Sequence, residues 1–302
     1  MVSYDAVVAR AYAHCEQLAR EHYENFPVAS RLLPAAMRPH IAAIYAFART
    51  ADDYADEPGI ASNERLRRLD VWGEQLAAAG SGRESCAGVH DSLPDTALAL
   101  VDPVFVALGQ TIRDCRLPIR LFEDLLSAFR QDVMTTRYDS WASVLDYCRR
   151  SANPVGRLVL RVAGYDDARL DAQSDAVCTA LQLANFWQDL GRDWAIGRLY
   201  VPNEDRITAG AREEDLTARA LTPEWRNVMQ VMVRRTRELF AAGRGVCDGV
   251  GGRLRWELRL TWLGGSRILD KLERADFDVF NRRPSIGRGD VPGLLRDAVL
   301  WR

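Results

Sequence analysis

The chain has no uninterrupted apolar run of the ~20 residues that a membrane-spanning helix needs. Its first residues carry charges at Asp5, Arg10 and Glu16 instead of the apolar core of a signal peptide. We therefore expect a cytoplasmic protein without a transmembrane anchor, which leaves peripheral contact with the inner face of the membrane open. No nucleic-acid partner is expected, because the net charge is near −2 and no basic tail is present.

Metal and redox motifs built from cysteine and histidine are also missing. The six cysteines are scattered without a C-x-x-C pair, and the four histidines include no H-E-x-x-H pair. This spacing fits reduced thiols in a cytoplasmic protein better than a disulfide framework or a zinc site.

Alternation of apolar and polar residues, which would indicate strands, is nowhere sustained, whereas helical spacing of apolar residues recurs along the chain. With 302 residues, 48% of them hydrophobic, the chain can bury a substantial core. We predict one all-α domain over residues 1–302 with about ten helices. Residues 80–94 are expected to form a surface loop, and residues 197–222 to be loop-like. The expected helices cover residues 4–24, 39–57, 63–79, 95–115, 118–133, 144–150, 175–195, 223–243 and 253–275, with a last one after Pro292.

The first acidic cluster lies in the segment Tyr45 to Glu57. Asp52 and Asp56 are four residues apart and share one helix face, and Tyr45 and Arg49 continue that face. Like charges at this spacing repel each other, so helix stability alone does not favour the arrangement. A bound magnesium ion would explain it, because magnesium binds carboxylate oxygens and keeps positions for water and substrate phosphates. An isolated D-x-x-x-D is more often a solvated acidic face.

A second cluster strengthens the metal interpretation. Oxygen-bearing side chains recur at spacings of three, four and four residues at Gln182, Asn185, Asp189 and Asp193. They therefore fall along one helical stripe. Two such stripes set among apolar residues suit two helices that face each other across a cavity, as in helical bundles with metal sites. We predict a bundle around a central cavity that holds magnesium.

Magnesium held by two carboxylate clusters suits a diphosphate, because the cations neutralise charge that develops on the leaving oxygens. Arg49 and Arg198 adjoin the stripes, and each could contact diphosphate or form an ordinary ion pair; we favour diphosphate. Most nearby aromatic residues are expected to be core, and a few to line a hydrocarbon channel: Phe26, Tyr45, Phe47, Phe186, Trp187 and Tyr200. The pattern predicts ionisation of an isoprenyl-type diphosphate, with its carbocation sheltered from water.

Both clusters resemble the aspartate-rich motifs of the squalene and phytoene synthases. The similar segments are A-I-Y-A-F-A-R-T-A-D-D-Y-A-D-E (43–57) and Q-L-A-N-F-W-Q-D-L-G-R-D-W-A-I-G-R-L-Y-V-P (182–202). The similarity extends through Tyr147-Cys148 and Val155-Gly156 and covers most of the chain. It implies an all-α isoprenoid synthase fold with a central cavity, magnesium and prenyl diphosphate substrates.

Position by position, the resemblance implies metal or diphosphate roles for Asp52, Asp56, Asn185, Asp189 and Asp193. It implies diphosphate contact for Arg49 and cavity-wall roles for Tyr45 and Gln182. We expect the catalytic residues to be Asp52, Asp56, Asp189, Asp193 and Arg49. We expect the substrate-binding residues to be Arg49, Tyr45, Gln182, Arg198, Phe26, Tyr200 and Asn153.

Three segments depart from the common family pattern. H-Y-E-N-F-P-V-A-S (22–30) replaces a serine-containing segment, and Gln188 stands where an arginine is common. R-R-S-A-N-P (149–154) replaces a segment whose tyrosine is associated with condensation, which puts condensation of two farnesyl diphosphates in doubt. Asn153-Pro154 and Gly156 also predict a helix break, a candidate functional irregularity.

The segments H-Y-E-N-F-P-V-A-S, C-R-R-S-A-N-P-V-G and N-F-W-Q-D look most like the hydroxysqualene synthases of the bacterial hopanoid pathway. Such enzymes expel diphosphate from presqualene diphosphate, and water captures the rearranged cation without a nicotinamide cofactor. The absence of a glycine-rich dinucleotide motif agrees with this reaction. We hypothesise that polar groups near Asn153 position the quenching water, and we expect other enzymes of the pathway to hand over the substrate.

Two other functions stay open. A head-to-head synthase that makes presqualene diphosphate, squalene or phytoene would consume farnesyl or geranylgeranyl diphosphate alone. A non-catalytic helical scaffold would keep its function after Asp52→Asn and Asp189→Asn. Both stripes are intact in residue type and spacing, which favours an enzyme.

Overall fold

The computed structural model describes residues 4–21, 32–80, 102–219 and 221–301. Within these ranges every regular element is a helix, apart from an isolated bridge between Arg137 and Leu199. The predicted all-α class is therefore confirmed. The helices form two compact units, one of Met1–Met134 with Arg157–Asp166 and the other of Thr135–Gly156 with Asp167–Arg302. That residues 1–302 act as one domain stays a prediction.

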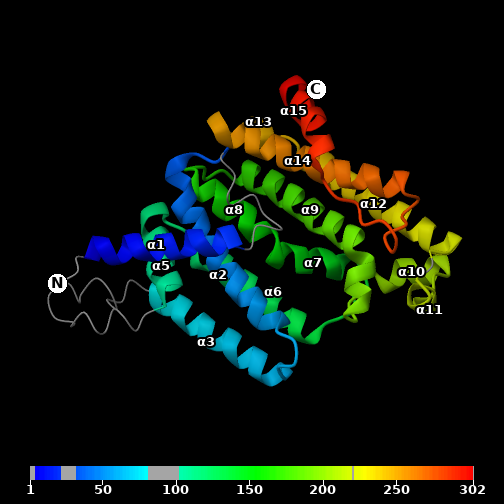
Figure 1. The fold of residues 1–302 in the computed structure, drawn as a ribbon, viewed down its shortest axis with the longest axis horizontal. Coiled ribbons are helices and arrows are strands. Elements are labelled where there is room, and N and C mark those ends of the chain that lie inside the picture. The colour runs from blue at the N-terminus through cyan, green and yellow to red at the C-terminus, as the bar shows by residue number, and fades with distance from the viewer. Residues whose placement is uncertain (1–3, 22–31, 81–101, 220, 302) are drawn as a thin grey trace. The chain divides into compact units, whose positions relative to one another are not determined.

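The first unit holds the earlier helices of the chain, coloured blue to green in Figure 1. They are α1 (Tyr4–Glu21), the 3-10 turn η2 (Ala35–Met37), α2 (Arg38–Asp56), α3 (Ser62–Gly80), α5 (Pro103–Cys115) and α6 (Ile119–Met134). Pro39 lies in the first turn of α2, where a missing N–H costs no helical hydrogen bond. The predicted loop at residues 80–94 falls almost entirely outside the described residues.

Phe47 of α2 lies at the centre of an aromatic core in this unit. Its ring contacts Phe122 of α6 edge-on at 5.4 Å and stacks against Trp72 of α3 at 6.0 Å between ring centroids. Trp72 in turn contacts Phe105 of α5 at 4.4 Å and donates its indole N–H to the carbonyl oxygen of Phe47. Because Phe47 fixes the rotation of α2, this core also determines which face of α2 remains outside it.

The second unit contains the later helices, coloured green to red in Figure 1. They are α7 (Trp141–Ser151), the start of α8 (Asn153–Val162), α9 (Ala168–Ala195), α10 (Asn203–Ala209), α11 (Glu213–Thr217), α12 (Pro223–Gly243), α13 (Val246–Gly249), α14 (Gly252–Arg274), η3 (Arg288–Asp290) and α15 (Val291–Leu300). The prediction of a loop over 197–222 was wrong where α10 and α11 form. The long helix α9 begins seven residues before its predicted start, because Asp167 caps the N–H groups of Arg169 and Leu170.

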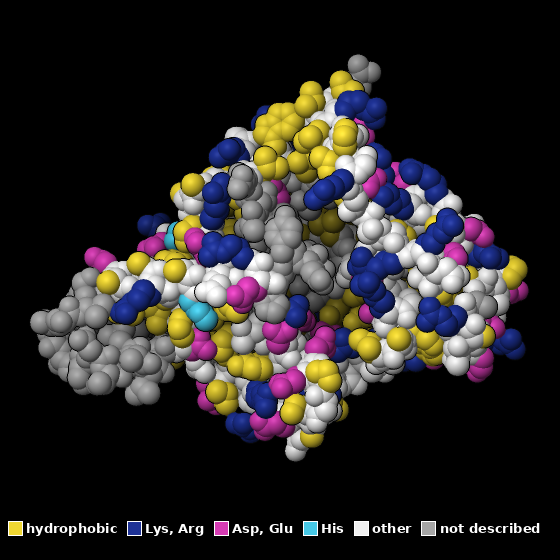
Figure 2. All heavy atoms as spheres, viewed as in Figure 1, with side chains coloured by type: hydrophobic (Ala, Val, Ile, Leu, Met, Phe, Trp, Pro, Cys, Tyr) yellow, Lys and Arg dark blue, Asp and Glu magenta, His cyan; other side chains and the backbone are white. Residues whose placement is uncertain are grey.

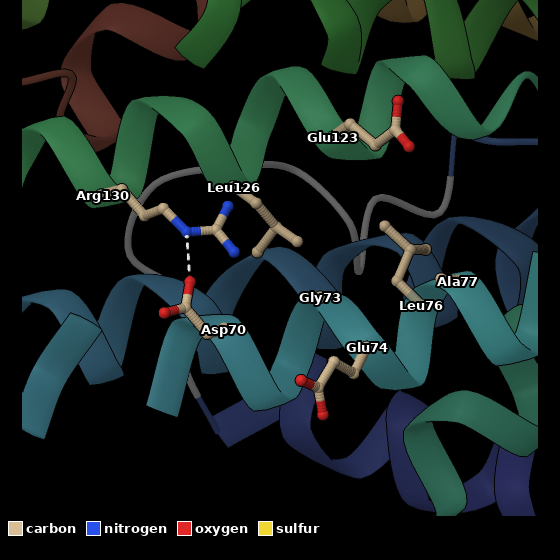
Figure 3. Close-up of a pocket in the computed structure, with 8 residues that line it drawn as sticks. All are labelled: Asp70, Gly73, Glu74, Leu76, Ala77, Glu123, Leu126 and Arg130. Atoms are coloured by element: carbon tan, nitrogen blue, oxygen red, sulfur yellow. Dashed lines mark hydrogen bonds and ion pairs between the residues drawn. The ribbon is translucent and has the colours of Figure 1, made fainter. Parts of the chain in front are cut away.

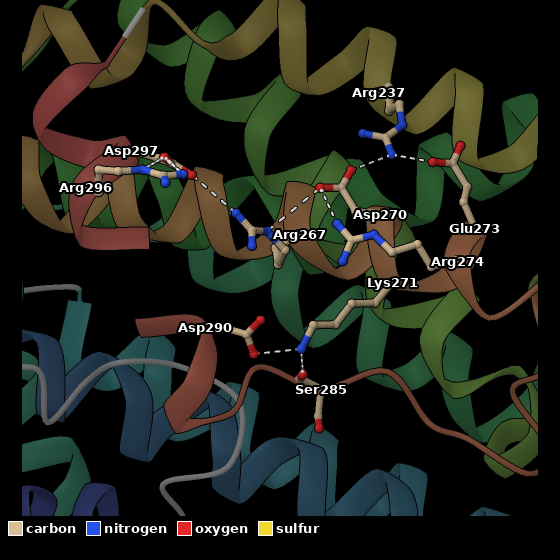
Figure 4. Close-up of polar contacts among 10 residues, drawn as sticks. All are labelled: Arg237, Arg267, Asp270, Lys271, Glu273, Arg274, Ser285, Asp290, Arg296 and Asp297. Atoms are coloured by element: carbon tan, nitrogen blue, oxygen red, sulfur yellow. Dashed lines mark hydrogen bonds and ion pairs between the residues drawn. The ribbon is translucent and has the colours of Figure 1, made fainter. Parts of the chain in front are cut away.

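Helix α9 runs through the core of the second unit and packs on α12. Trp187 of α9 is fully buried, and its indole N–H donates to the hydroxyl of Thr236 on α12 at 2.9 Å. Polar contacts then tie α14 to its neighbours (Figure 4). Arg237 of α12 bonds Asp270 of α14 at 2.8 Å, and Arg267 of α14 bonds Asp297 of α15 at 3.2 Å.

Helix α15 carries an exposed apolar face, which we call the α15 face: Val291, Leu295, Val299 and Leu300. Leu295 is 51% exposed and Val299 is 68% exposed. Figure 2 shows hydrophobic side chains gathered over this part of the second unit. None of the described helices is long and apolar enough to cross a membrane.

Candidate functional site

The first acidic cluster lies in the last turns of α2. Since α2 is continuous, its helical period places Tyr45, Arg49, Asp52 and Asp56 on one side, while Phe47 on another side is fully buried. Tyr45, Arg49 and Asp52 are half-buried, and Asp56 in the last turn of the helix is exposed. The sequence-predicted face is thus formed, and its acidic end is accessible to a ligand.

Arg49 is held by two aspartates of its own helix. Its Nη2 lies 2.7 Å from Asp53 Oδ1, and its Nη1 lies 3.7 Å from Asp52 Oδ2. Burial lowers the pKa of Arg49, but attraction to Asp53 and Asp52 outweighs burial and raises it overall. Its Nε is buried without a hydrogen-bond partner among the described residues. Asp53, to which the sequence assigns no role, therefore orients Arg49, the residue predicted to contact diphosphate.

The second cluster lies on α9, where Gln182, Asn185, Asp189 and Asp193 follow one side of an unbroken helix. All four side chains are half-buried. The amide of Asn185 donates to Asp189 Oδ2 at 2.8 Å, so adjacent turns of the stripe are already in contact. Burial raises the cost of leaving such oxygens without a cation or a donor.

Asp189 is also bound by an arginine that the sequence analysis did not find. Arg283 Nε donates to Asp189 Oδ1 at 2.5 Å, and Nη2 donates to Oδ2 at 2.8 Å. Nearby, Gln188 donates to the carbonyl oxygen of Pro284 at 2.5 Å. The ring of Phe280 packs so closely on α9 that a Cβ at Gly191 would lie 3.1 Å from it. Residues 280–284 therefore cover α9 at its acidic motif.

No local sequence motif indicates that Arg283 belongs to the candidate site. It lies 94 residues after Asp189 in a segment without regular structure. A basic residue after the last long helix is common in any helical protein, so the sequence offers no spacing that could single it out.

Tyr200 and Phe186 belong to a buried aromatic cluster. Their rings stack in parallel with centroids 3.7 Å apart. Tyr147 of α7 lies against Phe186 at 6.0 Å, and Tyr138 stacks on Tyr200 at 5.6 Å. This packing holds the segment after α9, where the backbone N–H of Arg198 donates to the carbonyl oxygen of Asp193 at 2.8 Å. Substrate contact by Tyr200 and Arg198 stays a prediction.

The predicted helix break is confirmed between α7 and α8. Ser140 caps the start of α7 in a capping box with Ser143, and α7 ends at Ser151; α8 starts at Asn153. Asn153 is buried, and its side-chain oxygen accepts a hydrogen bond from the hydroxyl of Thr179 on α9 at 2.9 Å. Thr179 was not among the predicted residues, although it lies three residues before Gln182 and extends the α9 stripe by one turn.

Metal binding by the two stripes stays a prediction. In the described parts of the chain, no group of three or more His, Cys, Asp or Glu side chains lies close enough to hold a metal ion. The stripe of α2 belongs to the first unit and that of α9 to the second, so their predicted approach across a cavity also stays a prediction. Phe26 lies outside the described residues.

A surface hollow of about 430 Å³ lies between α3 and α6 (Figure 3). Its lining carries charges of both signs and includes the ion pair between Arg130 and Asp70, at 2.9 Å. None of the sequence-predicted site residues lines it. We therefore assign no part of the predicted reaction to this hollow.

Comparison with known proteins gives concordant matches. The squalene/phytoene synthase family model matches residues 19–290. Hydroxysqualene synthase of Rhodopseudomonas palustris is 34% identical over 255 residues, covering 84% of this chain and 80% of that protein. Phytoene synthase of Arthrospira platensis is 29% identical over 286 residues, covering 90% of this chain and 87% of that protein.

A solved structure matches as well. The squalene synthase HpnC from Alicyclobacillus acidocaldarius superposes with a TM-score of 0.79 at 39% sequence identity, covering 89% of this chain and 95% of that chain. The similarity confirms the predicted isoprenoid synthase fold.

Proposed function

Because the chain belongs to the squalene/phytoene synthase family, we propose that it is a hydroxysqualene synthase, which converts presqualene diphosphate and water into hydroxysqualene and diphosphate. The family comprises head-to-head prenyl synthases. The observation that carries the finer proposal is the junction of α7 and α8. There, the family's condensation-associated tyrosine segment is replaced by residues that include the buried, hydrogen-bonded Asn153. A polar group beside a hydrocarbon substrate suits capture of a cation by water.

We further propose that magnesium assists the departure of diphosphate. The donor set fits this ion, because it consists of carboxylate and amide oxygens, the ligands that magnesium prefers. Asp52 and Asp56 on α2, and Asn185, Asp189 and Asp193 on α9, would hold it. When bound, magnesium would neutralise charge on the leaving diphosphate. Both carboxylate oxygens of Asp189 accept from Arg283, so a bound cation would compete with this guanidinium for the charge of Asp189.

The arginines of the two motifs are the proposed diphosphate ligands. Asp53 holds the guanidinium of Arg49 in a defined orientation, which leaves its remaining donors for a phosphate oxygen. Arg198 follows the second stripe directly, and its backbone bond to Asp193 keeps it beside that stripe. The proposed wall around the hydrocarbon uses Tyr45, Gln182, Phe26 and Tyr200.

A second candidate is a head-to-head condensing synthase, which the similarity to the Arthrospira platensis phytoene synthase favours. This enzyme would join two prenyl diphosphates and would need no water as a reactant. It would therefore turn over farnesyl or geranylgeranyl diphosphate supplied alone, whereas a hydroxysqualene synthase would leave both unchanged.

We also propose a cytoplasmic protein that touches the inner face of the membrane through the α15 face. Val291, Leu295 and Val299 are spaced by four residues and form one exposed apolar stripe. Arg288 and Arg296 are exposed in the same segment and suit anionic headgroups. Such contact would bring the protein close to its long-chain apolar substrate and to the enzymes that hand it over.

The deciding experiment incubates the purified protein with presqualene diphosphate and magnesium, without a nicotinamide cofactor, and identifies the product by mass spectrometry. We expect hydroxysqualene and an equal amount of diphosphate. Squalene alone, or no turnover, would remove the proposal. Parallel incubations with farnesyl and geranylgeranyl diphosphate test the condensing alternative.

A further inference from the structure

Helices α7 and α8 run antiparallel to α9 in a constant register. Tyr147 of α7 lies against Phe186 of α9. Six residues after Tyr147, Asn153 accepts a hydrogen bond from Thr179, which lies seven residues before Phe186 on α9. One turn further on, a Cβ at Gly156 would lie 2.3 Å from the Ser174 hydroxyl oxygen. Because only glycine permits this approach, Gly156 brings the α7–α8 junction directly against α9.

The hydrogen bond from Thr179 orients the amide of Asn153. Asn153 is 8% exposed and Thr179 is 6% exposed, so solvent does not compete for this bond. Thr179 Oγ1 donates to Asn153 Oδ1 at 2.9 Å, which turns the amide NH2 group of Asn153 away from Thr179. Within the described ranges, that NH2 group donates to no protein atom.

A second buried polar group lies at the same junction. The hydroxyl oxygen of Ser151, the last residue of α7, is buried and has no hydrogen-bond partner in the part of the chain that the structure describes. Buried polar groups are almost always hydrogen-bonded, and ordered water is their usual partner where protein groups are lacking. Ser151 and Asn153 are separated by one residue, so the junction holds a buried hydroxyl without a partner and an amide NH2 group that donates to no described protein atom.

The junction lies toward one end of the α9 stripe. Thr179 is ten residues before Asp189, so ~15 Å of helix separates it from the proposed metal ligand. If the ions and the diphosphate occupy the acidic end of α9, Thr179 and Asn153 lie on the hydrocarbon side of the site. Gln182 lies between these two ends.

We propose that Ser151 and Asn153, with Thr179 as a positioning residue, bind the single water molecule that captures the carbocation. This inference rests on the proposed hydroxysqualene synthase function. The C–O bond to diphosphate breaks and its electron pair leaves with the diphosphate. After rearrangement of the cation, a lone pair of the bound water forms the new C–O bond. The resulting oxonium ion loses its proton to the released diphosphate, the base that the reaction itself produces.

The chemistry of the three side chains limits their role. Amide and hydroxyl groups do not ionise near neutral pH, so they orient the water and cannot remove its proton. Loss of the site should therefore change which product forms more than it changes how fast diphosphate leaves. A cation that lacks a positioned water loses a proton and yields an alkene.

The test uses the full chain with presqualene diphosphate and magnesium, and measures diphosphate release and the product mixture separately. Thr179→Val keeps the size of the side chain and removes the donor. We expect diphosphate release within about threefold of the unaltered protein, a share of hydroxysqualene at least fivefold lower, and alkene in its place. Asn153→Leu should lower that share at least tenfold. Thr179→Ser keeps the hydroxyl donor, so this variant should form the same share of hydroxysqualene as the unaltered protein.

Thr236→Val is the matched control, because it also removes a buried threonine hydroxyl, one that accepts from Trp187 instead. Its product mixture should match that of the unaltered protein. An unchanged mixture in folded Thr179→Val and Asn153→Leu proteins would overturn the water site alone. No conversion of presqualene diphosphate by the unaltered protein would overturn the proposed function and the water site together.

A second measurement does not depend on activity or on the folding of variants. A high-resolution crystal structure of the unaltered protein should show one ordered water within about 3.2 Å of both Asn153 Nδ2 and Ser151 Oγ. A junction closed by direct protein contacts, without that water, would overturn the proposal.

Discussion

Arg283 and Asp189 form a two-pronged ion pair, with Nε donating to Oδ1 at 2.5 Å and Nη2 donating to Oδ2 at 2.8 Å. Both oxygens that the second motif would offer to a metal thus accept from one guanidinium. The side chain of Asp189 is only 14% exposed, so this pair is shielded from solvent. Arg283 therefore compensates the charge of Asp189 in the protein without metal, and a bound cation would compete with it.

Replacing Arg283 tests this competition. In the absence of divalent ions, Arg283→Ala leaves Asp189 with the amide of Asn185 at 2.8 Å and the exposed guanidinium of Arg192 at 3.8 Å. We expect the free energy of unfolding to fall by about 1–3 kcal/mol, the cost of leaving a buried polar group without its partner. Millimolar magnesium should remove more than half of that loss, because the ion replaces the guanidinium. Urea unfolding with a chelator and with magnesium measures both values.

Arg237→Ala is the matched control, since Arg237 pairs with Asp270 and Glu273 away from the stripes (Figure 4). Its loss of stability should be the same with and without magnesium. If Arg283→Ala also lost the same unfolding free energy with and without magnesium, Asp189 would not hold the ion.

Neutralising one carboxylate in each motif should abolish turnover. Asp52→Asn and Asp189→Asn keep the size of the side chain but remove the negative charge that holds magnesium, so we expect kcat/KM to fall at least ~100-fold. Diphosphate release from presqualene diphosphate measures this loss, and circular dichroism checks the fold. Asp70→Asn, which breaks the surface pair with Arg130, should leave the rate within about twofold (Figure 3). Full activity of both motif variants would favour the scaffold interpretation.

Alkaline pH should destabilise the protein through its buried thiols. Burial raises the pKa of Cys15 and of Cys247 from an ordinary value of 9.0 to about 12. Below pH 9 both the native and the unfolded state hold the proton, so stability does not change. Above pH 9 the unfolded thiols ionise first, and the free energy of unfolding should fall by about 2 kcal/mol per thiol at pH 10.5.

Urea unfolding at pH 8.5 and pH 10.5 measures this fall in the free energy of unfolding. The double variant Cys15→Ala, Cys247→Ala loses both groups, so its stability should decline less between the two pH values, whatever its stability at pH 8.5. A decline as steep as that of the unaltered protein would show that these thiols do not cause it.

The α15 face should bind anionic membranes. We expect the protein to sediment with vesicles that contain phosphatidylglycerol, and the combined change Leu295→Glu, Val299→Glu to lower binding at least tenfold, because it places charge in the apolar stripe. Ile207→Glu is the control: Ile207 is 67% exposed but lies on α10, outside the α15 face. Equal vesicle binding by the Leu295/Val299 variant and the unaltered protein would contradict the membrane proposal.

Much of the local architecture could be predicted, because helix formation and helix faces depend on residues three and four apart. The long helices and the all-α class follow from apolar spacing, and the two stripes follow from the positions of Asp52, Asp56, Asp189 and Asp193. The predicted helix boundaries differ from those of the structure in two places. The cap by Asp167 extended α9 toward its beginning, and α10 and α11 formed where the composition indicated a loop.

The contacts that complete the candidate site could not be predicted in the same way. Arg283 reaches Asp189 across 94 residues, and Asn153 meets Thr179 across 26, so neither pair leaves a periodic trace in the chain. Both pairs depend on how separate segments pack: the close approach at Gly156 aligns α8 with α9, and Phe280 against Gly191 brings Arg283 to the acidic motif. Periodicity specifies which face of a helix carries the reactive groups, whereas side-chain packing between distant segments specifies which partners those groups meet.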